Sequence, residues 1–450
     1  MLLHVPVSLD GLLSLFRGAF SQPSFQTFRA MVIGQVSQTG RRSVCGMLVG
    51  ARLSGVWEHS RAHRFFSRAR WQPDSLGLAL AALIVERFLA AEQPVTIAVD
   101  DTLLQRWGRK VYGCFYHHDA TANSEQAAVA WGNNWVVVGI CVKLPVLERT
   151  VCLPVLFRLW RPRRAEYAKA NKRDPERPGK PAIAREMIDL LAARLPGRRI
   201  DLVGDAAYAT EAWRGLPSTV TITSRLRANT VIYQPTPGRT GNRGRPRKWG
   251  RRLPRLSEIA IDAATQWTEQ TVRRYGKTET VLLHTINCLW EPLGPDTPVR
   301  VIIVADDTKP AGYQLALITT DLTATPARIV ERYTDRWAIE VCFEEAKHQA
   351  GVGDAQNRTE KAVQRTVPFQ FLTMTLTIIW YAQDGHHPND IAEHRARAPW
   401  YLSKTNPSFA DMLAKLRRTI IADQYSPERL RAPYQQKITA IQQAWAAMLG

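Results

Sequence analysis

The sequence lacks three features that would place a chain of 450 residues in a familiar structural class. Its 6 cysteines stand far apart with no Cys-x-x-Cys pair, which argues against a zinc knuckle or a disulfide framework and favours a reducing compartment. Its longest apolar run, 76–85, ends at Glu86 and is too short for a membrane span. The first residues, MLLHVPVSLDG, have no basic lead and make a poor signal peptide. We therefore expect a soluble, cytoplasmic protein with no membrane partner.

Negative charge is also scarce. The 40 acidic residues face 60 basic ones, which leaves a net charge of +20 and a pI near 10.0. Arginine far outnumbers lysine, and its planar guanidinium suits bidentate contacts with phosphate. A field of this sign attracts polyanions, although a basic surface that serves only solubility is the simpler alternative. The charge favours nucleic acid as the partner.

Apolar periodicity divides the chain into three regions. Residues 1–92 carry Leu, Phe, Val and Met at spacings of three and four, which predicts a helical region. Residues 93–385 mix short strand patterns with helices, and 386–450 return to polar helical patterns. Because the chain is strongly basic, we expect the first region to bind nucleic acid and the second to form a mixed α/β core.

Short apolar runs in the central region predict an ordered set of elements. These are strand 94–101, strand 134–145, strand 149–159, helix 181–195, strand 199–205 and strand 219–226. With a helix between the last two strands, this is the order of a ribonuclease-H-like α/β core. Later strand patterns at 279–290, 298–307 and 312–322 predict a β-rich insertion at about 228–322. A long helix from Pro326 to about Ala350 and an apolar helix at 363–381 are expected to follow it.

Two groups of basic residues are candidates for contacts with DNA. Arg61, Arg64 and Arg68 share one helical face, which is either a phosphate-contacting face or a solvated one. The stretch 225–255 holds ten basic residues and no acidic one, so we expect a loop that orders on DNA. Its DNA-binding candidates are Arg243, Arg245, Arg247 and Lys248. Its core, 244–246, is either a minor-groove hook or a plain electrostatic loop.

Two aspartates each close an apolar strand. Asp100 ends TIAVD and Asp205 ends IDLVGD. An acid at the carboxyl end of a strand in an open α/β sheet points into the crevice where ligands bind, although a single strand-end Asp is more often a turn or cap residue. We expect these two strands to be neighbours, which would bring both carboxylates together.

A stripe on the long helix supplies a third acid. Tyr333, Arg336 and Lys347 stand at −7, −4 and +7 from Glu340. At ~100° per residue all four project from one face within about 40°, which indicates either a functional face or a salt-bridged solvent face. Three carboxylates beside basic side chains suit two Mg²⁺ ions, which together activate a nucleophile and stabilise a leaving oxygen at a phosphodiester.

These residues resemble one large group of bacterial insertion-sequence DDE transposases, whose signature is Y-x2-R-x3-E-x6-K. VGDAAY and IAVDDT are similar to the strand motifs that hold that group's two aspartates. The resemblance implies that Asp100, Asp205 and Glu340 form the catalytic, metal-binding triad for two Mg²⁺ ions, with Mn²⁺ as a substitute. It also implies that Tyr333, Arg336 and Lys347 contact the transposon end. Asp101 stays open as an alternative metal ligand.

The same resemblance implies cut-and-paste transposition on double-stranded DNA by a homodimer in a synaptic complex, located at the bacterial nucleoid. Several members of the group cut the second strand through a DNA hairpin. A non-catalytic DNA-binding relic of a transposase and a structure-specific nuclease are the alternatives. All three acids are present with their basic companions, which favours an active enzyme.

Histidine and tryptophan give weaker signals. His117, His118 and Asp119 are either a metal cluster or, since adjacent residues point apart, ordinary loop residues. Trp249 and Trp290 are either stacking platforms for an extruded base or packed side chains.

Overall fold

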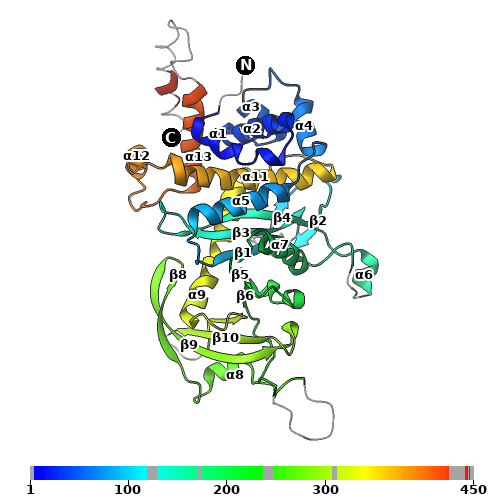
Figure 1. The fold of residues 1–450 in the computed structure, drawn as a ribbon, viewed down its shortest axis with the longest axis vertical. Helices are drawn as coiled ribbons and strands as arrows, with labels where there is room; N and C mark the ends of the chain where they lie inside the picture. Colours follow the sequence, from blue (N-terminus) through cyan, green and yellow to red (C-terminus); the bar gives the residue numbers. More distant parts are fainter. Residues whose placement is uncertain are drawn as a thin grey trace.

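Eleven described strands join into one mixed sheet in the computed structural model of the chain (Figure 1). The structure describes residues 5–118, 129–170, 172, 174–236, 248–306, 312–424, 441–443 and 445. The strands are β1 (Val95–Gln105), β2 (Phe115–His118), β3 (Val129–Lys143), β4 (Thr150–Trp160), β5 (Ile200–Gly204), β6 (Val220–Arg225), β7 (Ile232–Tyr233), β8 (Thr268–Arg274), β9 (Lys277–Trp290), β10 (Pro298–Asp306) and β11 (Leu315–Thr319). Their order is β2-β3-β1-β5-β6-β11-β10-β9-β7, with β4 paired to β3 and β8 to β9.

The centre of the sheet sets the positions of Asp100 and Asp205. The prediction that Asp100 ends its strand is wrong, because β1 continues beside β3 to Gln105 and only its pairing with β5 stops at Val99. β1 pairs in parallel with β5, and Val99 lies opposite Gly204. Both strands are buried through this stretch, as the apolar runs predict. Asp100 and Asp205 each follow the last registered pair, so both lie at the same edge of the sheet. The expectation that these strands are neighbours is confirmed.

The segment between β5 and β6 differs from the prediction. In place of a core helix the chain forms two short 3₁₀ turns, η3 (Ala206–Tyr208) and η4 (Glu211–Trp213). The side chains of Asp205 and Thr210 accept hydrogen bonds from the amides of the first turns. Each of these bonds caps one short turn.

The β-rich segment is part of the main sheet. β11 pairs with β6, where Leu317 lies opposite Arg225, and β10 and β9 continue from β11. Figure 1 shows these strands with α8 (Leu256–Ile261) at the end of the molecule away from the N-terminal helices. The predicted insertion therefore extends the central sheet, and its bounds as a domain stay a prediction.

Helices precede the first strand, as the sequence predicts. They are α1 (Val7–Ser14), α2 (Gln22–Ser37), α3 (Val44–Gly50), α4 (His59–Ser67) and α5 (Pro73–Phe88). α2 and α3 cross closely at Gly34, where a Cβ would lie 1.8 Å from the carbonyl oxygen of Met47. The crossing therefore requires glycine.

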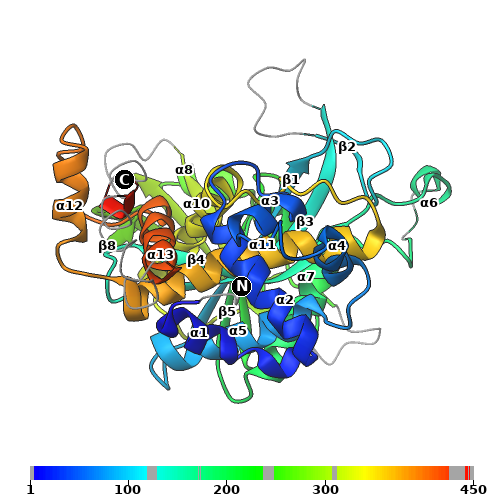
Figure 2. The same ribbon diagram turned by 90° about the horizontal axis from the view of Figure 1, so that it is seen from above.

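The remaining helices surround the sheet and continue to the end of the described chain. They are α6 (Ala165–Lys169), α7 (Lys180–Arg194), α9 (Pro326–Asp335), α10 (Trp337–His348), α11 (Glu360–Trp380), α12 (Asp390–Arg397) and α13 (Phe409–Gln424). α11 is buried along most of its length and packs on β4, α4, α5 and α13. Figures 1 and 2 show it crossing the molecule beneath the N-terminal helices.

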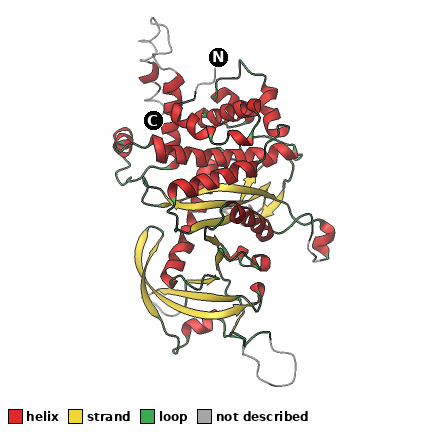
Figure 3. Ribbon diagram, viewed as in Figure 1, coloured by secondary structure: helices red, strands yellow, loops and turns green. Residues whose placement is uncertain are grey.

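One hydrophobic core joins the two ends of the chain. It runs from Leu9 in α1 through the sheet to Ile420 in α13. The N-terminal helices thus pack on the same core as the sheet, and Figure 3 shows helices gathered at this end. A second cluster packs α9 against the β8–β10 strands. Within the described residues, no helix is long and apolar enough to span a membrane.

The long helix predicted from Pro326 to about Ala350 is wrong in one detail, because Arg336 interrupts it. The amide of Arg336 donates to the carbonyl of Tyr333 at 3.2 Å, and the amide of Ile339 donates to the carbonyl of Arg336 at 2.9 Å. These i to i−3 bonds tighten the turn between α9 and α10. Arg336 itself keeps α-helical backbone angles, φ −54° and ψ −34°, so Tyr333 and Glu340 stay within reach of its side chain.

Candidate active site

Arg336 links the carboxylate of Asp100 on β1 with the carboxylate of Glu340 on α10. Its Nη1 donates to Oδ2 of Asp100 at 2.9 Å, and its Nη2 donates to Oε1 of Glu340 at 2.6 Å. Asp100 comes from β1, and Glu340 lies in the first turn of α10, which packs on β1. Charge-assisted bonds of this length fix both carboxylates around one cation.

Asp100 is the most strongly perturbed acid of this group. Burial raises its pKa to about 7, and the nearby charge of Asp205 acts in the same direction, while Arg336 opposes them. The carboxyl therefore holds its proton more tightly than an exposed aspartate does. A carboxylate in this state gains from any further positive charge placed beside it.

Asp205 contributes its carboxylate from the end of β5. Its Oδ1 accepts a hydrogen bond from the amide of Ala207 at 2.8 Å, which fixes the side chain at the start of η3. Asp205 also lines a cavity of about 440 Å³. The other side chains of interest in its wall are Arg225, Arg227, Tyr333 and Arg336. The cavity thus joins one predicted acid with two residues of the predicted stripe.

Asp101 is engaged in a different interaction. Its Oδ2 accepts from Nζ of Lys180 at 2.6 Å, at the start of α7. Lys180 also lies 5.0 Å from the ring centroid of Trp160. Asp101 therefore pairs with a fixed cation of its own, whereas Asp100 faces α10.

Tyr208 is a buried phenol close to all of these acids. It is 1% exposed, and its hydroxyl lies close to Asp101. Burial raises its pKa well above the usual range, and the charges of Asp101, Asp100 and Asp205 add to the effect. The phenol therefore remains protonated, as a neutral donor held behind the carboxylates.

The other residues of the stripe are less closely grouped. Tyr333 is 6% exposed, and the guanidinium of Arg336 lies 5.8 Å from its ring centroid. Lys347 lies about two turns beyond Glu340 in α10, roughly 10 Å along the axis. The structure brings Tyr333, Arg336 and Glu340 together and leaves Lys347 further along the helix.

The predicted basic DNA contacts of the N-terminal region lie on α4 and just after it. Arg61 is packed on Trp57, with 3.6 Å between its guanidinium and the ring centroid, and it donates to Thr27. Arg64 is exposed on α4, while Arg68 lies just past the end of that helix. The three therefore do not share one continuous helical face. Arg243, Arg245 and Arg247 lie outside the described residues, and Lys248 is exposed beside them.

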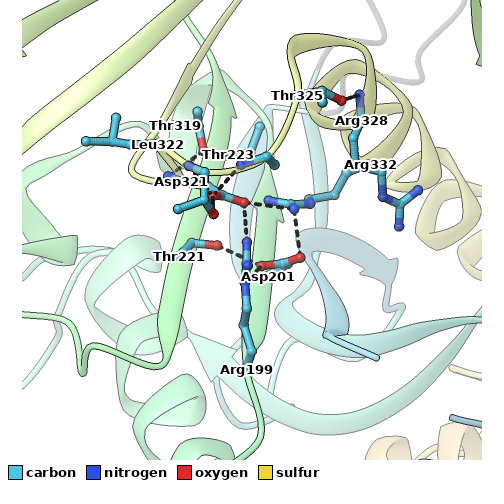
Figure 4. Close-up of polar contacts among 12 residues, drawn as sticks. Arg199, Asp201, Thr221, Thr223, Thr319, Asp321, Leu322, Thr325, Arg328 and Arg332 are labelled. Atoms are coloured by element: carbon cyan, nitrogen blue, oxygen red, sulfur yellow. Dashed lines mark hydrogen bonds and ion pairs between the residues drawn. The ribbon is translucent and has the colours of Figure 1, made fainter. Parts of the chain in front are cut away.

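A buried ion cluster holds α9 against the sheet (Figure 4). Arg332 of α9 donates from Nη2 to Asp201 at 2.9 Å and to Asp321 at 3.0 Å. Arg199 also pairs with both aspartates. Burial would raise the pKa of Asp321, but hydrogen bonds from Thr323 and its neighbours outweigh burial and hold that pKa below its usual range. Because Tyr333 follows Arg332 directly, this cluster fixes the backbone position of Tyr333, the first residue of the predicted stripe.

Sequence reasoning missed several of these residues. Arg225 is the last residue of β6, so the strand-end rule that selected Asp205 could also have selected it. Tyr208 stands three residues after Asp205, and Lys180 directly precedes the predicted helix 181–195, but neither has a local signal that points to the acids. Their positions depend on contacts between segments distant in sequence.

The donor set fits a hard divalent cation. Within the described residues no three His, Cys, Asp or Glu side chains are already grouped as metal ligands. Asp100 and Glu340 nevertheless share one cation, the guanidinium of Arg336, and the charge of Asp205 acts on Asp100. Carboxylate oxygens are the ligands that Mg²⁺ and Mn²⁺ prefer. These three acids are the side chains that could hold such ions.

Carboxylates clustered beside arginines are typical of enzymes that act on phosphodiesters. Residues 16–284, more than half of the 450, match the family model described as DDE superfamily endonuclease, and the chain belongs to this family. The match includes Asp100 and Asp205 and ends before Glu340. Membership of this family indicates a nuclease-type enzyme whose substrate is DNA. Enzymes of the family generally use divalent metals. The comparison with curated proteins gave no match.

Proposed function

We propose that the protein is a DNA transposase that cleaves the ends of its element and joins them to target DNA by a cut-and-paste route. The observation that carries the proposal is the bridge from Asp100 through Arg336 to Glu340, beside the cavity that Asp205 lines. Family membership supports cleavage of DNA, and the Tyr-Arg-Glu-Lys spacing supports transposition.

The proposed metal ligands are Asp100, Asp205 and Glu340. Two Mg²⁺ ions, replaceable by Mn²⁺, would activate the attacking oxygen and stabilise the leaving oxygen. The pairing of Asp101 with Lys180 supports Asp100 as the first ligand. In this proposal the ion pair with Lys180 holds Asp101 on the opposite side of β1 from Asp100. It stabilises the part of β1 that carries Asp100.

The arginines around the cavity bind and orient the DNA in this proposal. Arg225 and Arg227 enter from the end of β6, and Tyr333 and Arg336 enter from α9 and the turn after it. Their guanidiniums form bidentate hydrogen bonds with the phosphates on either side of the scissile bond, and the phenol of Tyr333 donates to a phosphate oxygen. Lys347 contacts the same strand further along α10.

We further propose that β1 and β3–β6 form a ribonuclease-H-like core within residues 93–385. The parallel pairing of β1 with β5 and of β5 with β6, next to antiparallel β3 and β4, supports this assignment. The helical region 1–92 reads the transposon end, the β-rich segment at about 228–322 lies inside the core, and 386–450 form a helical C-terminal region. Two copies assemble on paired DNA ends.

Cleavage of a DNA fragment that carries the boundaries of the element tests the proposal. Wild-type protein is expected to cut at the boundary in Mg²⁺ and not in EDTA, and Glu340→Gln is expected to bind the fragment without cutting it. Glu344→Gln, an exposed carboxylate one turn further along α10, is the matched control and should cut normally. Binding without cleavage by wild type, in Mg²⁺ or Mn²⁺, would instead indicate a DNA-binding relic. Cuts at DNA structures irrespective of sequence would indicate a structure-specific nuclease.

A further inference from the structure

A second cavity, of about 690 Å³, opens on the helical side of the molecule. It lies where the turn between α4 and α5 meets α11 and the segment after α1. Of the described residues in its wall, none is acidic and four are basic: Arg68, Arg70, Lys361 and Arg365. The first three are exposed, and Arg365 is 7% exposed. The cavity therefore has a basic rim and a buried cation in its wall.

Among the described residues, Arg365 contacts neutral groups rather than a carboxylate. Its Nη1 donates to the carbonyl oxygen of Phe66 at 3.3 Å, and its guanidinium lies 5.3 Å from the ring centroid of Trp71. Among the described residues, no carboxylate lies within ion-pair distance of it. Burial lowers the pKa of Arg365, as expected for a cation removed from water without a counterion. A buried guanidinium in this situation is stabilised by any anion that enters the cavity.

The N-terminus of α5 adds positive potential to the same space. This helix has 16 residues and begins at Pro73, and the side chain of Gln72 does not cap it. Gln72 and Ser75 both line the cavity. Uncapped amides at the start of a helix carry a partial positive charge and bind anions. Asp74 in the same turn pairs with Arg158 through both carboxylate oxygens, at 2.7 Å each, and does not line the cavity.

We propose that this cavity binds a phosphate group of the DNA backbone and is a second DNA contact, separate from the carboxylate site. The inference rests on the proposed function for its DNA partner. Arg365 and the first amides of α5 bind the phosphate in the cavity, while Arg68, Arg70 and Lys361 hold the adjoining backbone at the rim. Phosphate contacts of this kind fix the register of the DNA on the protein and carry no base specificity.

Binding of a plain 30-base-pair duplex in EDTA over a range of NaCl concentrations tests the proposal. Arg70→Ala/Lys361→Ala is the test variant, because both side chains are exposed and their loss leaves the core intact. Arg87→Ala/Arg194→Ala is the matched control, since it removes the same charge from the far end of α5 and from α7. The test variant should bind the duplex at least about tenfold more weakly than wild type. The slope of the logarithm of its association constant against the logarithm of the NaCl concentration should become shallower by more than about one unit. The control should stay near wild type in both measurements. Equal losses in both variants would overturn the proposal.

A second comparison addresses the buried arginine. Arg365→Lys keeps a cation and should retain most of the affinity, whereas Arg365→Gln should lose it, with thermal melting used to select variants that remain folded. Wild type in sodium phosphate should melt at a higher temperature than in sodium chloride of equal ionic strength, and Arg365→Gln should lose that difference. Phosphate could also raise the melting temperature while both double variants bind DNA as wild type does. That result would assign the cavity to free phosphate and overturn the DNA contact.

The metal-free assay separates this inference from the proposed function. If wild type fails to cut DNA in Mg²⁺ but the test variant still binds more weakly than the control, the proposed transposase activity fails and the phosphate site stands. If wild type cuts at the element boundary and the test variant binds like the control, the activity stands and the phosphate site fails.

Discussion

Asp100 and Asp101 are adjacent on β1, yet their carboxylates pair with cations from different helical elements. Asp100 accepts from Arg336 at 2.9 Å, and Asp101 accepts from Lys180 at 2.6 Å. Successive side chains of a strand point to opposite faces, which explains why two neighbouring acids reach α10 and α7 respectively. The sequence alone leaves both residues as candidate metal ligands. Because their carboxylates pair with different cations, we expect Asp100 to bind metal and Asp101 to hold the contact with Lys180.

The first prediction concerns this pair of acids. Asp100→Asn should reduce the rate of metal-dependent DNA cleavage more than about 100-fold, because loss of a direct ligand exceeds the 10–100-fold typical of a residue that only orients one. Asp101→Asn should reduce it less than about 100-fold, since it removes only the contact with Lys180. Single-turnover cleavage in Mg²⁺ measures both. A larger loss for Asp101→Asn than for Asp100→Asn would reverse the assignment of the first ligand.

The second prediction separates the two partners of Arg336. Its guanidinium neutralises Asp100 and Glu340 in the metal-free protein, and its pKa is raised by these acids although burial alone would lower it. Arg336→Ala removes a cation that competes for the carboxylates, so the affinity for Mn²⁺ should rise or stay constant while DNA cleavage falls. Titration with Mn²⁺ and single-turnover cleavage give the two readouts.

The control for Arg336 is a change that keeps the charge. Arg336→Lys retains a cation but not the fork that reaches both acids, so Mn²⁺ affinity should lie between those of wild type and Arg336→Ala. A marked loss of Mn²⁺ affinity in Arg336→Ala would contradict the prediction, because it would mean that the arginine organises the metal site.

The third prediction concerns pH. The pKa of Asp100 is raised to about 7 by burial and by the charge of Asp205, so a proton and a metal ion compete for it near neutral pH. Mn²⁺ affinity should fall about tenfold for each pH unit below 7, since one proton must leave for the ion to bind. Calorimetric titration between pH 5.5 and 8 checks this. The Asp101→Asn protein should keep the same profile, and a flat profile in wild type would contradict the prediction.

The same shift has a consequence for folding without metal. The ordinary pKa of the carboxyl is 3.8, and the folded protein raises it to about 7. The folded state binds the proton more tightly, so this group stabilises the fold less as pH rises from about 4 to 7. Mn²⁺ should therefore raise the melting temperature more at pH 8 than at pH 6.

Much of the scaffold follows from the sequence, because local patterns encode it. The apolar runs before Asp100 and Asp205 form the paired parts of β1 and β5, and the register of Val99 with Gly204 places both acids just past the end of that pairing. The break at Arg336 has no such signal. Helix propensity is continuous through it, and the turn forms where Arg336 reaches Asp100, a residue 236 positions away.

The surroundings of the acids also depend on long-range contacts. Lys180 stands 79 positions from Asp101 and belongs to no motif, so it could not be selected from the sequence. Arg336 and Glu340 are four residues apart on the predicted stripe, so their pairing could be anticipated, whereas the contact of Arg336 with Asp100 could not.

The fourth prediction concerns the ion cluster beneath the stripe. Arg332 is 2% exposed, and Asp201 and Asp321 are equally buried. Arg332→Ala should lower the free energy of unfolding by about 3–5 kcal/mol, because it leaves two buried carboxylates to share Arg199. Urea unfolding measures the loss, and Arg328→Ala, an exposed arginine one turn earlier in α9, should change stability by less than about 0.5 kcal/mol. If both variants are equally stable, the cluster does not hold α9 on the sheet, and the position of Tyr333 and Arg336 must depend on the apolar contacts of α9 with β8 and β9.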